Sequence, residues 1–251
     1  MSAHSPDLPA EVIRYLDSLA SAPADATPLD EVRFVSLDCE TTGTDAKKDR
    51  IITIGAITVQ DGEIMLEDQS EAMLHVSHNT SSVLVHGITA EEATQEGVTQ
   101  AEALAGFLDY LRGAVIVGHH IGFDVEVMQH ACQRNFGIDL ANRWIDTMEV
   151  TLHLDDEGVF EELAQAAGVT LPPFRNFSLD GLCVLVHVEP HHRHSVLGDA
   201  LITSQIFLQL LRLAPLQART KRGVMAQRHG ESLAHERGYG CISGYGVRPR
   251  R

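Results

Sequence analysis

The spacing of apolar and polar residues predicts a domain that begins with antiparallel strands and continues with alternating strands and helices. Apolar runs around the turn signal Asp61-Gly62 predict three consecutive antiparallel strands in the first part of this domain. A later run between Gly113 and Gly118 is apolar without interruption, which is typical of a strand buried on both faces. The predicted strand segments are residues 34–37, 51–59, 63–66, 72–76 and 114–117.

Apolar side chains three and four positions apart predict helices before, between and after these strands. Thr89 and Glu92 form a capping-box signature, which predicts one helix start. Residues 144–148 fit either a short strand or the start of a helix. Strands and helices that alternate in this way predict an α/β domain. The other predicted helices cover residues 8–19, 99–112, 123–136, 178–186 and 199–213.

Composition divides the chain into an N-terminal extension, a main domain and a C-terminal tail. We expect residues 1–32 to form a helix and a linker rich in Ala and Pro, residues 33–213 to form the domain, and residues 214–251 to be largely disordered. The N-terminal helix could pack on the domain, mediate dimerisation or contact a partner. The tail has eight basic residues against two acidic ones, so it could attract single-stranded nucleic acid or serve only as a solubilising end.

The overall composition is that of a globular protein, and it argues against several classes of function. A net charge of −16 disfavours a general polyanion-binding surface. No apolar run approaches the roughly 18 to 20 residues that span a bilayer, and the N-terminus lacks the order of a signal peptide, so we expect a cytoplasmic protein without a membrane partner. The four cysteines form no Cys-x-x-Cys pair, which argues against a zinc knuckle or a disulfide framework.

Acidic residues at three points of the chain are candidates for chemistry. Asp38 and Glu40 are two positions apart, so a strand places them on one face, where two negative charges need a compensating cation. Asp124 follows the buried strand, at the edge where ligand sites of open α/β sheets lie, although a helix start also favours an acid without any function. His194 stands five residues before Asp199 at the start of the last helix.

These motifs occur in the order and spacing of the DEDD exonucleases, in the subclass whose last motif contains a histidine. Residues 33–213 resemble this family, which includes the proofreading epsilon subunit of bacterial DNA polymerase III. Segments 85–89, 117–119 and 145–147 are also similar to short sequence motifs of epsilon-like exonuclease domains. The resemblance implies a ribonuclease H-like mixed sheet, in which three antiparallel strands are followed by parallel strands and the sheet is flanked by helices.

The four carboxylates of these motifs form an all-oxygen donor set that suits Mg²⁺ or Mn²⁺ better than zinc. Two such ions about 4 Å apart can hold the attacking and leaving oxygens of a displacement at phosphorus. His194 is the candidate base for the attacking water, because an imidazole titrates near neutral pH. By analogy with the family, Asp38 would bridge both ions, Glu40 would bind the ion that holds this water, and Asp124 and Asp199 would complete the ligands.

The resemblance also implies a function and a set of substrate contacts. The function would be that of a metal-dependent 3′-to-5′ exonuclease of the repair or proofreading type, which releases nucleoside 5′-monophosphates and favours DNA. Thr41 and Thr42 would contact the terminal nucleotide or only close a turn, and Phe123 would pack at the site. His120 stands where the family commonly has an asparagine, and it would reach the substrate or only pack within its loop. Asp146 would hold the metal ligands in position without binding a cation itself, or it would cap a helix.

Other functions are compatible with the same fold. An RNA-trimming 3′-to-5′ exoribonuclease is one, because the family also contains ribonuclease T and oligoribonuclease and nothing in the sequence reads a 2′-hydroxyl. A binding module without turnover is another, although the complete acidic set and His194 argue against it. The expected partner is the 3′ end of a nucleic acid, preferably single-stranded. A DNA polymerase subunit is a second candidate partner, but a free-standing nuclease is equally compatible with the sequence.

Overall fold

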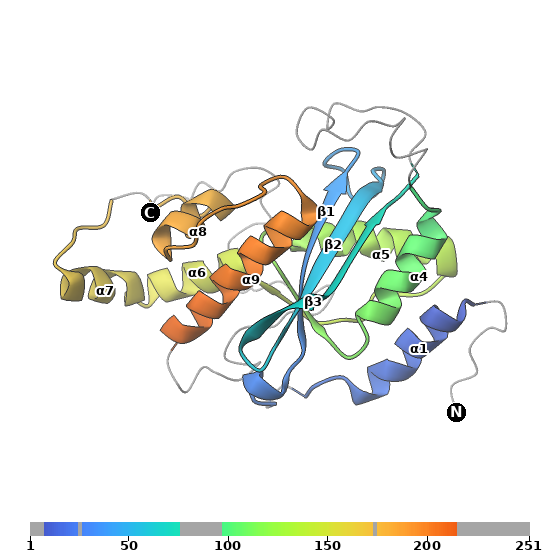
Figure 1. The fold of residues 1–251 in the computed structure, drawn as a ribbon, viewed down its shortest axis with the longest axis horizontal. Coiled ribbons are helices and arrows are strands. Elements are labelled where there is room, and N and C mark those ends of the chain that lie inside the picture. Colours follow the sequence, from blue (N-terminus) through green and yellow to red (C-terminus); the bar gives the residue numbers. More distant parts are fainter. Residues whose placement is uncertain (1–7, 25–26, 76–96, 173–174, 215–251) are drawn as a thin grey trace, which may run out of the picture.

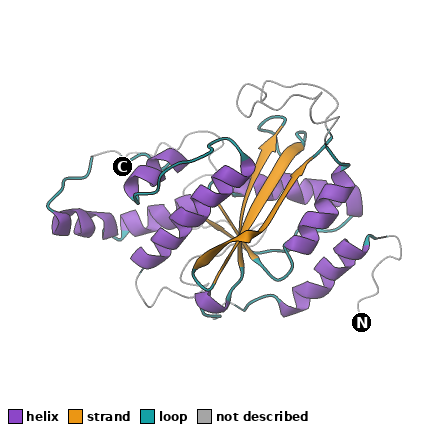
Figure 2. Ribbon diagram, viewed as in Figure 1, coloured by secondary structure: helices purple, strands orange, loops and turns teal. Residues whose placement is uncertain are grey.

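A mixed sheet of five strands forms the centre of the computed structural model, which describes residues 8–24, 27–75, 97–172 and 175–214 (Figures 1 and 2). The strand order is β3-β2-β1-β4-β5. β1 to β3 are antiparallel neighbours, whereas β4 is parallel to β1 and β5 is parallel to β4. The predicted mixed sheet is therefore confirmed. Its strands are β1 Phe34–Thr41, β2 Ile51–Gln60, β3 Glu63–Met73, β4 Val115–Gly118 and β5 Trp144–Asp146.

The hairpin between β2 and β3 turns at Asp61 and Gly62, as predicted. Both residues have left-handed backbones, with φ of 54° and 76°, which is the conformation that a two-residue hairpin turn requires. β3 runs without interruption from the predicted segment 63–66 into the predicted segment 72–76 and ends at Met73, although residues 67–71 are all polar; residue 76 lies outside the described residues. Its register with β2 shifts between Ile57 and Thr58, and the edge position of β3 leaves its outward side chains in solvent. Backbone pairing thus continues where the apolar alternation stops.

Two groups of helices cover the two faces of the sheet (Figure 1). α1, α4 and α5 share one apolar core with one face, and α6 to α9 share a second core with the other. Residues 144–148 were predicted to form either a short strand or the start of a helix, and they form both, because β5 ends at Asp146 and α6 begins at Thr147. The sequence pattern did not predict the rest of α6 or α7. The helices are α1 Ala10–Ser18, α4 Gln100–Tyr110, α5 Gly122–Phe136, α6 Thr147–Asp156, α7 Val159–Ala167, α8 Leu179–Leu185 and α9 Val196–Leu213, with short 3-10 turns at Leu19–Ser21 and Leu29–Glu31.

The N-terminal helix α1 packs on the domain, which is one of the three roles considered for it. Tyr15 is fully buried, and its hydroxyl donates to Asn142 Oδ1 and accepts from the backbone N–H of Ala141, each at 2.8 Å. On the exposed side, Arg14 donates to both carboxylate oxygens of Asp109 on α4, at 2.9 and 2.8 Å. The helix start predicted at residues 89–92 and the basic tail from residue 215 lie outside the described residues.

Helix α9 lies across β1 and β2 (Figure 1), and small residues allow this close approach. A Cβ atom added at Gly55 on β2 would lie 2.8 Å from atoms of Val196, including its backbone carbonyl carbon. Ser36 on β1 is buried and donates a hydrogen bond of 2.7 Å to the carbonyl oxygen of Ala200. These contacts hold the first turns of α9 against the two strands.

By length and composition alone, α9 is the one described helix that could cross a membrane. However, 56% of its 18-residue window is buried inside the protein, and its first turn carries Asp199. Its Phe207 ring also meets the ring of Phe34 edge-on, with centroids 5.0 Å apart. These contacts are those of a core helix that covers a sheet.

Candidate active site

Strand β1 carries Asp38 and Glu40 past the end of its apolar run. Asp38 pairs with Gly55 of β2, and Glu40 pairs with Thr53. Side chains alternate along a strand, so both acids share the face of Ser36, whose hydroxyl is bonded to α9. Asp38 and Glu40 therefore face the start of α9 from the sheet.

Asp124 reaches the same region from the first turn of α5. This helix follows β4, and β4 is parallel to β1, so their carboxyl ends lie at one edge of the sheet. The Asp124 side chain is buried, and burial raises its pKa, while hydrogen bonds from the backbone N–H groups of Asp124 and Cys39 oppose this shift. The bond from Cys39 ties Asp124 to the backbone between the two acids of β1.

Asp199 and His194 approach from α9 and the loop before it. Ser195 caps the helix, because its hydroxyl accepts a bond of 3.1 Å from the backbone N–H of Gly198. Asp199 is buried in the first turn, and its Oδ2 accepts a bond of 3.3 Å from the backbone N–H of His194. His194 itself is exposed and has a left-handed backbone with φ of 65°, a conformation that is uncommon for residues other than glycine.

The electrostatics show that the four carboxylates form one cluster. Burial raises the pKa of Asp38 well above its usual range, and the charges of Asp124 and Asp199 raise it further. Burial also raises the pKa of Glu40 to about 7, again with a contribution from Asp199. The positive charge of Arg193 opposes the shifts of the pKa values of both Asp38 and Glu40. The cluster is therefore short of positive charge.

The donor chemistry of this cluster fits hard divalent cations, which prefer carboxylate oxygens. Thr53 Oγ1, on the strand position opposite Glu40, is buried and has no hydrogen-bond partner among the described residues. Within the described part of the chain, however, no three His, Cys, Asp or Glu side chains are already arranged as a ligand group. Asp199 Oδ1 is instead engaged in an ion pair with Arg193.

Comparison with known proteins places the chain in a family. A sequence model for a family described as Exonuclease matches residues 35–207. The chain belongs to this exonuclease family. A PolC-type DNA polymerase III of Thermotoga petrophila is 31% identical over 182 residues, which cover 72% of this chain and 12% of that protein. A DNA polymerase III subunit epsilon-like protein of Rhodobacter capsulatus is 27% identical over 217 residues, which cover 82% of this chain and 28% of that protein.

A solved structure has the same fold as this exonuclease domain. The zinc-bound form of Escherichia coli exonuclease I in complex with single-stranded DNA superposes with a TM-score of 0.60 and 21% identity, over 72% of this chain and 40% of that one. The chain therefore spans less than half of each of these three proteins. The resemblance that the sequence motifs indicate is confirmed.

The hydroxyls of Thr41 and Thr42 close the turn that follows β1 in the exonuclease domain. Thr41 Oγ1 donates to the carbonyl oxygen of Gly43 at 2.7 Å, and Thr42 Oγ1 donates to Asp49 Oδ1 at 2.8 Å. Phe123 is partly buried and packs against the core shared by α1, α4 and α5. Roles for these three residues in contacting the substrate stay predictions.

His120 and Asp146 hold the loop that leads into α5. His120 has a left-handed backbone with φ of 55°, and its N–H donates a 3.0 Å bond to Asp146 Oδ1. Asparagine and histidine both tolerate this conformation better than most residues, which explains how one replaces the other. Asp146 also caps α6 through Met148, and burial raises its pKa to about 6. A capping role for Asp146 is therefore observed.

Two residues at the site were not predicted from the sequence. Arg193 contacts Asp199, and Gly55 makes room for α9 opposite Asp38. An arginine next to a candidate histidine and a glycine inside a strand carry only weak signals. Arg193 and Gly55 could therefore be assigned to the site only from the folded structure.

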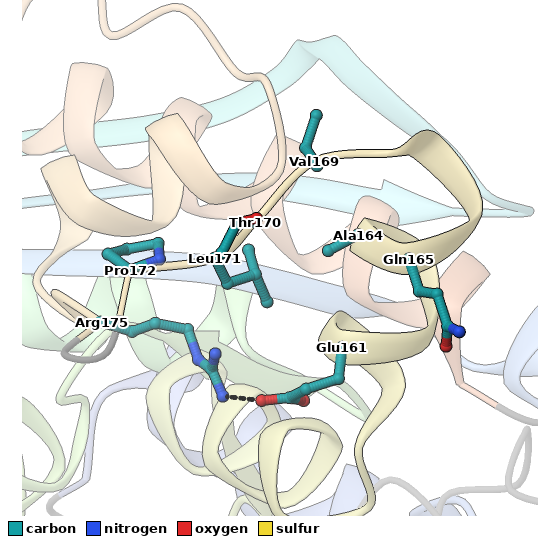
Figure 3. A pocket seen from close by; sticks show the side chains of 8 residues that line it. All are labelled: Glu161, Ala164, Gln165, Val169, Thr170, Leu171, Pro172 and Arg175. Atoms are coloured by element: carbon teal, nitrogen blue, oxygen red, sulfur yellow. Dashed lines mark hydrogen bonds and ion pairs between the residues drawn. The ribbon is translucent and has the colours of Figure 1, made fainter.

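An open pocket of about 490 Å³ lies beside α7 (Figure 3). Arg175 and Glu161 form an ion pair of 2.5 Å at its rim. None of the predicted site residues lines this pocket. Its lining residues are Glu161, Ala164, Gln165, Val169, Thr170, Leu171, Pro172 and Arg175.

Proposed function

We propose that this domain is a 3′-to-5′ exonuclease that uses two divalent cations, Mg²⁺ or Mn²⁺, to hydrolyse phosphodiester bonds at the 3′ end of nucleic acids. The products are nucleoside 5′-monophosphates, and DNA is the favoured substrate. One observation carries this proposal: four carboxylates from β1, α5 and α9 converge in one electrostatic cluster, and a histidine stands at the start of α9.

The four carboxylates would hold the cations. When bound, such ions lower the pKa of a water molecule and offset negative charge on the phosphate. Asp38 lies close to the other members of the cluster, because the charges of Asp124, Asp199 and Glu40 raise its pKa in addition to burial. Ionising this cluster without cations is costly, since buried like charges repel each other. The chain thus contributes a donor set that is complete only with added positive charge.

His194 would accept the proton of the attacking water. His194 is exposed, and its backbone N–H donates to Asp199 Oδ2, so the residue lies next to the cluster on a side that a nucleic acid end can reach from solvent. An imidazole accepts a proton near neutral pH, which suits a general base. The left-handed backbone of His194 and the helix cap formed by Ser195 fix the position of the backbone from which the imidazole extends.

The relatives support DNA as the substrate. Exonuclease I of Escherichia coli binds single-stranded DNA in its solved complex, and the sequence relatives are polymerase III proteins. We therefore propose a single-stranded 3′ end as the substrate and DNA repair or proofreading as the setting. A polymerase partner belongs to the same proposal, and co-purification with a polymerase catalytic subunit tests it.

The test is digestion of 5′-labelled DNA and RNA oligonucleotides with Mg²⁺, Mn²⁺ or EDTA. We expect stepwise shortening from the 3′ end of single-stranded DNA, release of mononucleotides, and no digestion in EDTA. Asp38→Asn should lower the rate by about a thousandfold or more, because it removes the charge of the carboxylate that we propose to bridge both ions. Glu67→Gln is the matched control, since Glu67 is an exposed acid on β3, and it should digest at the wild-type rate.

The same panel separates the alternatives. Digestion that continues in EDTA, or full activity of Asp38→Asn, would overturn the metal-dependent mechanism. Preferential digestion of RNA would make the protein an exoribonuclease. Binding of oligonucleotides without any digestion by the wild type would make the domain a binding module.

A further inference from the structure

Arg193 is a cation inside the acidic cluster. Its Nη1 pairs with Asp199 Oδ1, and its Nε donates a 2.7 Å bond to Asp180 Oδ1 in the first turn of α8. The Arg193 side chain is 22% exposed and that of Asp199 only 10%, so this ion pair is largely shielded from solvent. The second oxygen of Asp199 accepts the N–H of His194. Both oxygens of Asp199 are thus engaged by residues 193 and 194.

The loop before α9 is built to place Arg193 there. His192 and His194, which flank it, both have left-handed backbones, with φ of 53° and 65°. The carbonyl oxygen of His192 lies so close to Gly198 that a Cβ at this glycine would be 2.0 Å away, and it also accepts a bond from the Ser195 hydroxyl. The loop therefore folds back over the first turn of α9, and Arg193 lies between the two residues with left-handed backbones, His192 and His194.

We propose that Arg193 is the counter-ion of Asp199 before a cation binds, that it holds this carboxylate in position, and that it competes with the incoming cation for it. This inference rests on the proposed function, in which Asp199 is a metal ligand. It makes Arg193 a positioning residue that sets the affinity of the site for divalent cations.

The competition has a physical basis in the two bonds to Asp199. A backbone N–H and a cation can share a carboxylate, because each oxygen has more than one lone pair. A guanidinium carries a full positive charge, so it repels a divalent ion at the same carboxylate. Asp180 is 64% exposed, and it gives Arg193 a second partner when Asp199 binds a cation. Removing the charge of Arg193 should therefore strengthen cation binding.

The test is calorimetric titration of the protein with Mn²⁺ in the absence of nucleic acid. Arg193→Met and Arg193→Gln should both bind Mn²⁺ at least about tenfold more tightly than the wild type, because one charge a few ångströms from a divalent ion has this effect even when screened as in water. Arg193→Lys keeps the charge and should bind Mn²⁺ with nearly the wild-type affinity. Arg14→Met is the matched control, since Arg14 also bridges two carboxylates, Glu11 and Asp109, and it should leave Mn²⁺ affinity unchanged.

The outcomes separate this inference from the proposed function. Unchanged or weaker Mn²⁺ binding by a folded Met or Gln variant would overturn the competition. Equal tightening in Arg193→Lys would also overturn it, because the charge is still present there. A wild-type protein that neither binds Mn²⁺ nor digests DNA would instead refute the proposed function itself.

Discussion

The approach of α9 to Gly55 makes a single methyl group a sharp test of how the site is assembled. In Gly55→Ala the new Cβ would lie 2.8 Å from three atoms of Val196, whereas carbon atoms normally pack about 3.5 to 4.0 Å apart. One of these atoms is the backbone carbonyl carbon, so a rotamer change cannot relieve the clash. The start of α9 must move by about 1 Å.

That shift would displace the residues that α9 and its loop bring to the site. Val196 lies two residues after His194 and three before Asp199. A misplacement of 1 Å costs about a hundredfold in rate, so we expect the exonuclease rate of Gly55→Ala to fall by about this factor. Overpacking costs about 1 to 3 kcal/mol, which corresponds to a fall of about 2 to 12 °C in Tm.

The measurements are the digestion rate of a single-stranded oligonucleotide and the thermal midpoint by circular dichroism. The rate is measured at least about 10 °C below the midpoint of the variant, so that loss of folded protein does not contribute. Gly106→Ala is the matched control, because a Cβ at this position of α4 meets nothing within 4 Å. It should stabilise the protein by about 0.5 to 1 kcal/mol and keep its activity.

The reasoning is refuted if Gly55→Ala keeps both the wild-type rate and the wild-type midpoint. A fall in midpoint without a fall in rate would show that α9 moves without carrying His194 and Asp199 away. Alanine is a better strand residue than glycine, so any loss that is observed must come from the contact with Val196.

Two further predictions concern stability. Tyr15→Phe should lower the free energy of unfolding by about 1 to 3 kcal/mol and leave digestion unchanged, because Asn142 and the N–H of Ala141 lose a buried partner. Urea unfolding measures this change, and an unchanged free energy of unfolding would contradict the prediction. In EDTA, the free energy of unfolding should fall as the pH rises from about 4 to 7. Glu40 and Asp146 have pKa values raised by burial to about 7 and 6, so the folded protein holds protons that the unfolded chain has released. Urea unfolding across this range checks the sign, and a flat or rising profile would contradict it.

The prediction from the sequence was most complete where the signal is local. The strand pattern of β1, the turn at Asp61 and Gly62 and the buried strand β4 were all predicted, because side-chain alternation and turn chemistry act over a few residues. It was weakest at α6 and α7. There, β5 passes into a helix at Asp146 without an intervening loop, and two glycines, Gly158 and Gly168, flank the short helix α7.

The family resemblance and the identity of the four acidic residues were determined by the sequence alone. Alternation along β1 places Asp38 and Glu40 on one face, and the spacing of His194 and Asp199 is a property of the chain itself. These features need no knowledge of which elements touch. Their roles as metal ligands and as a base stay predictions until the digestion panel is done.

Only the tertiary structure decided which residues pack around the acids and that the side chain of Arg193 pairs with Asp199. The contacts of Gly55 with Val196 and of Tyr15 with Asn142 join residues more than a hundred positions apart, and no local period encodes such a pair. The bond of Arg193 to Asp199 is close in sequence, but it depends on a loop that folds back over a helix start. The physical reason is that periodicity fixes the direction of a side chain, whereas its partner is chosen when the elements pack.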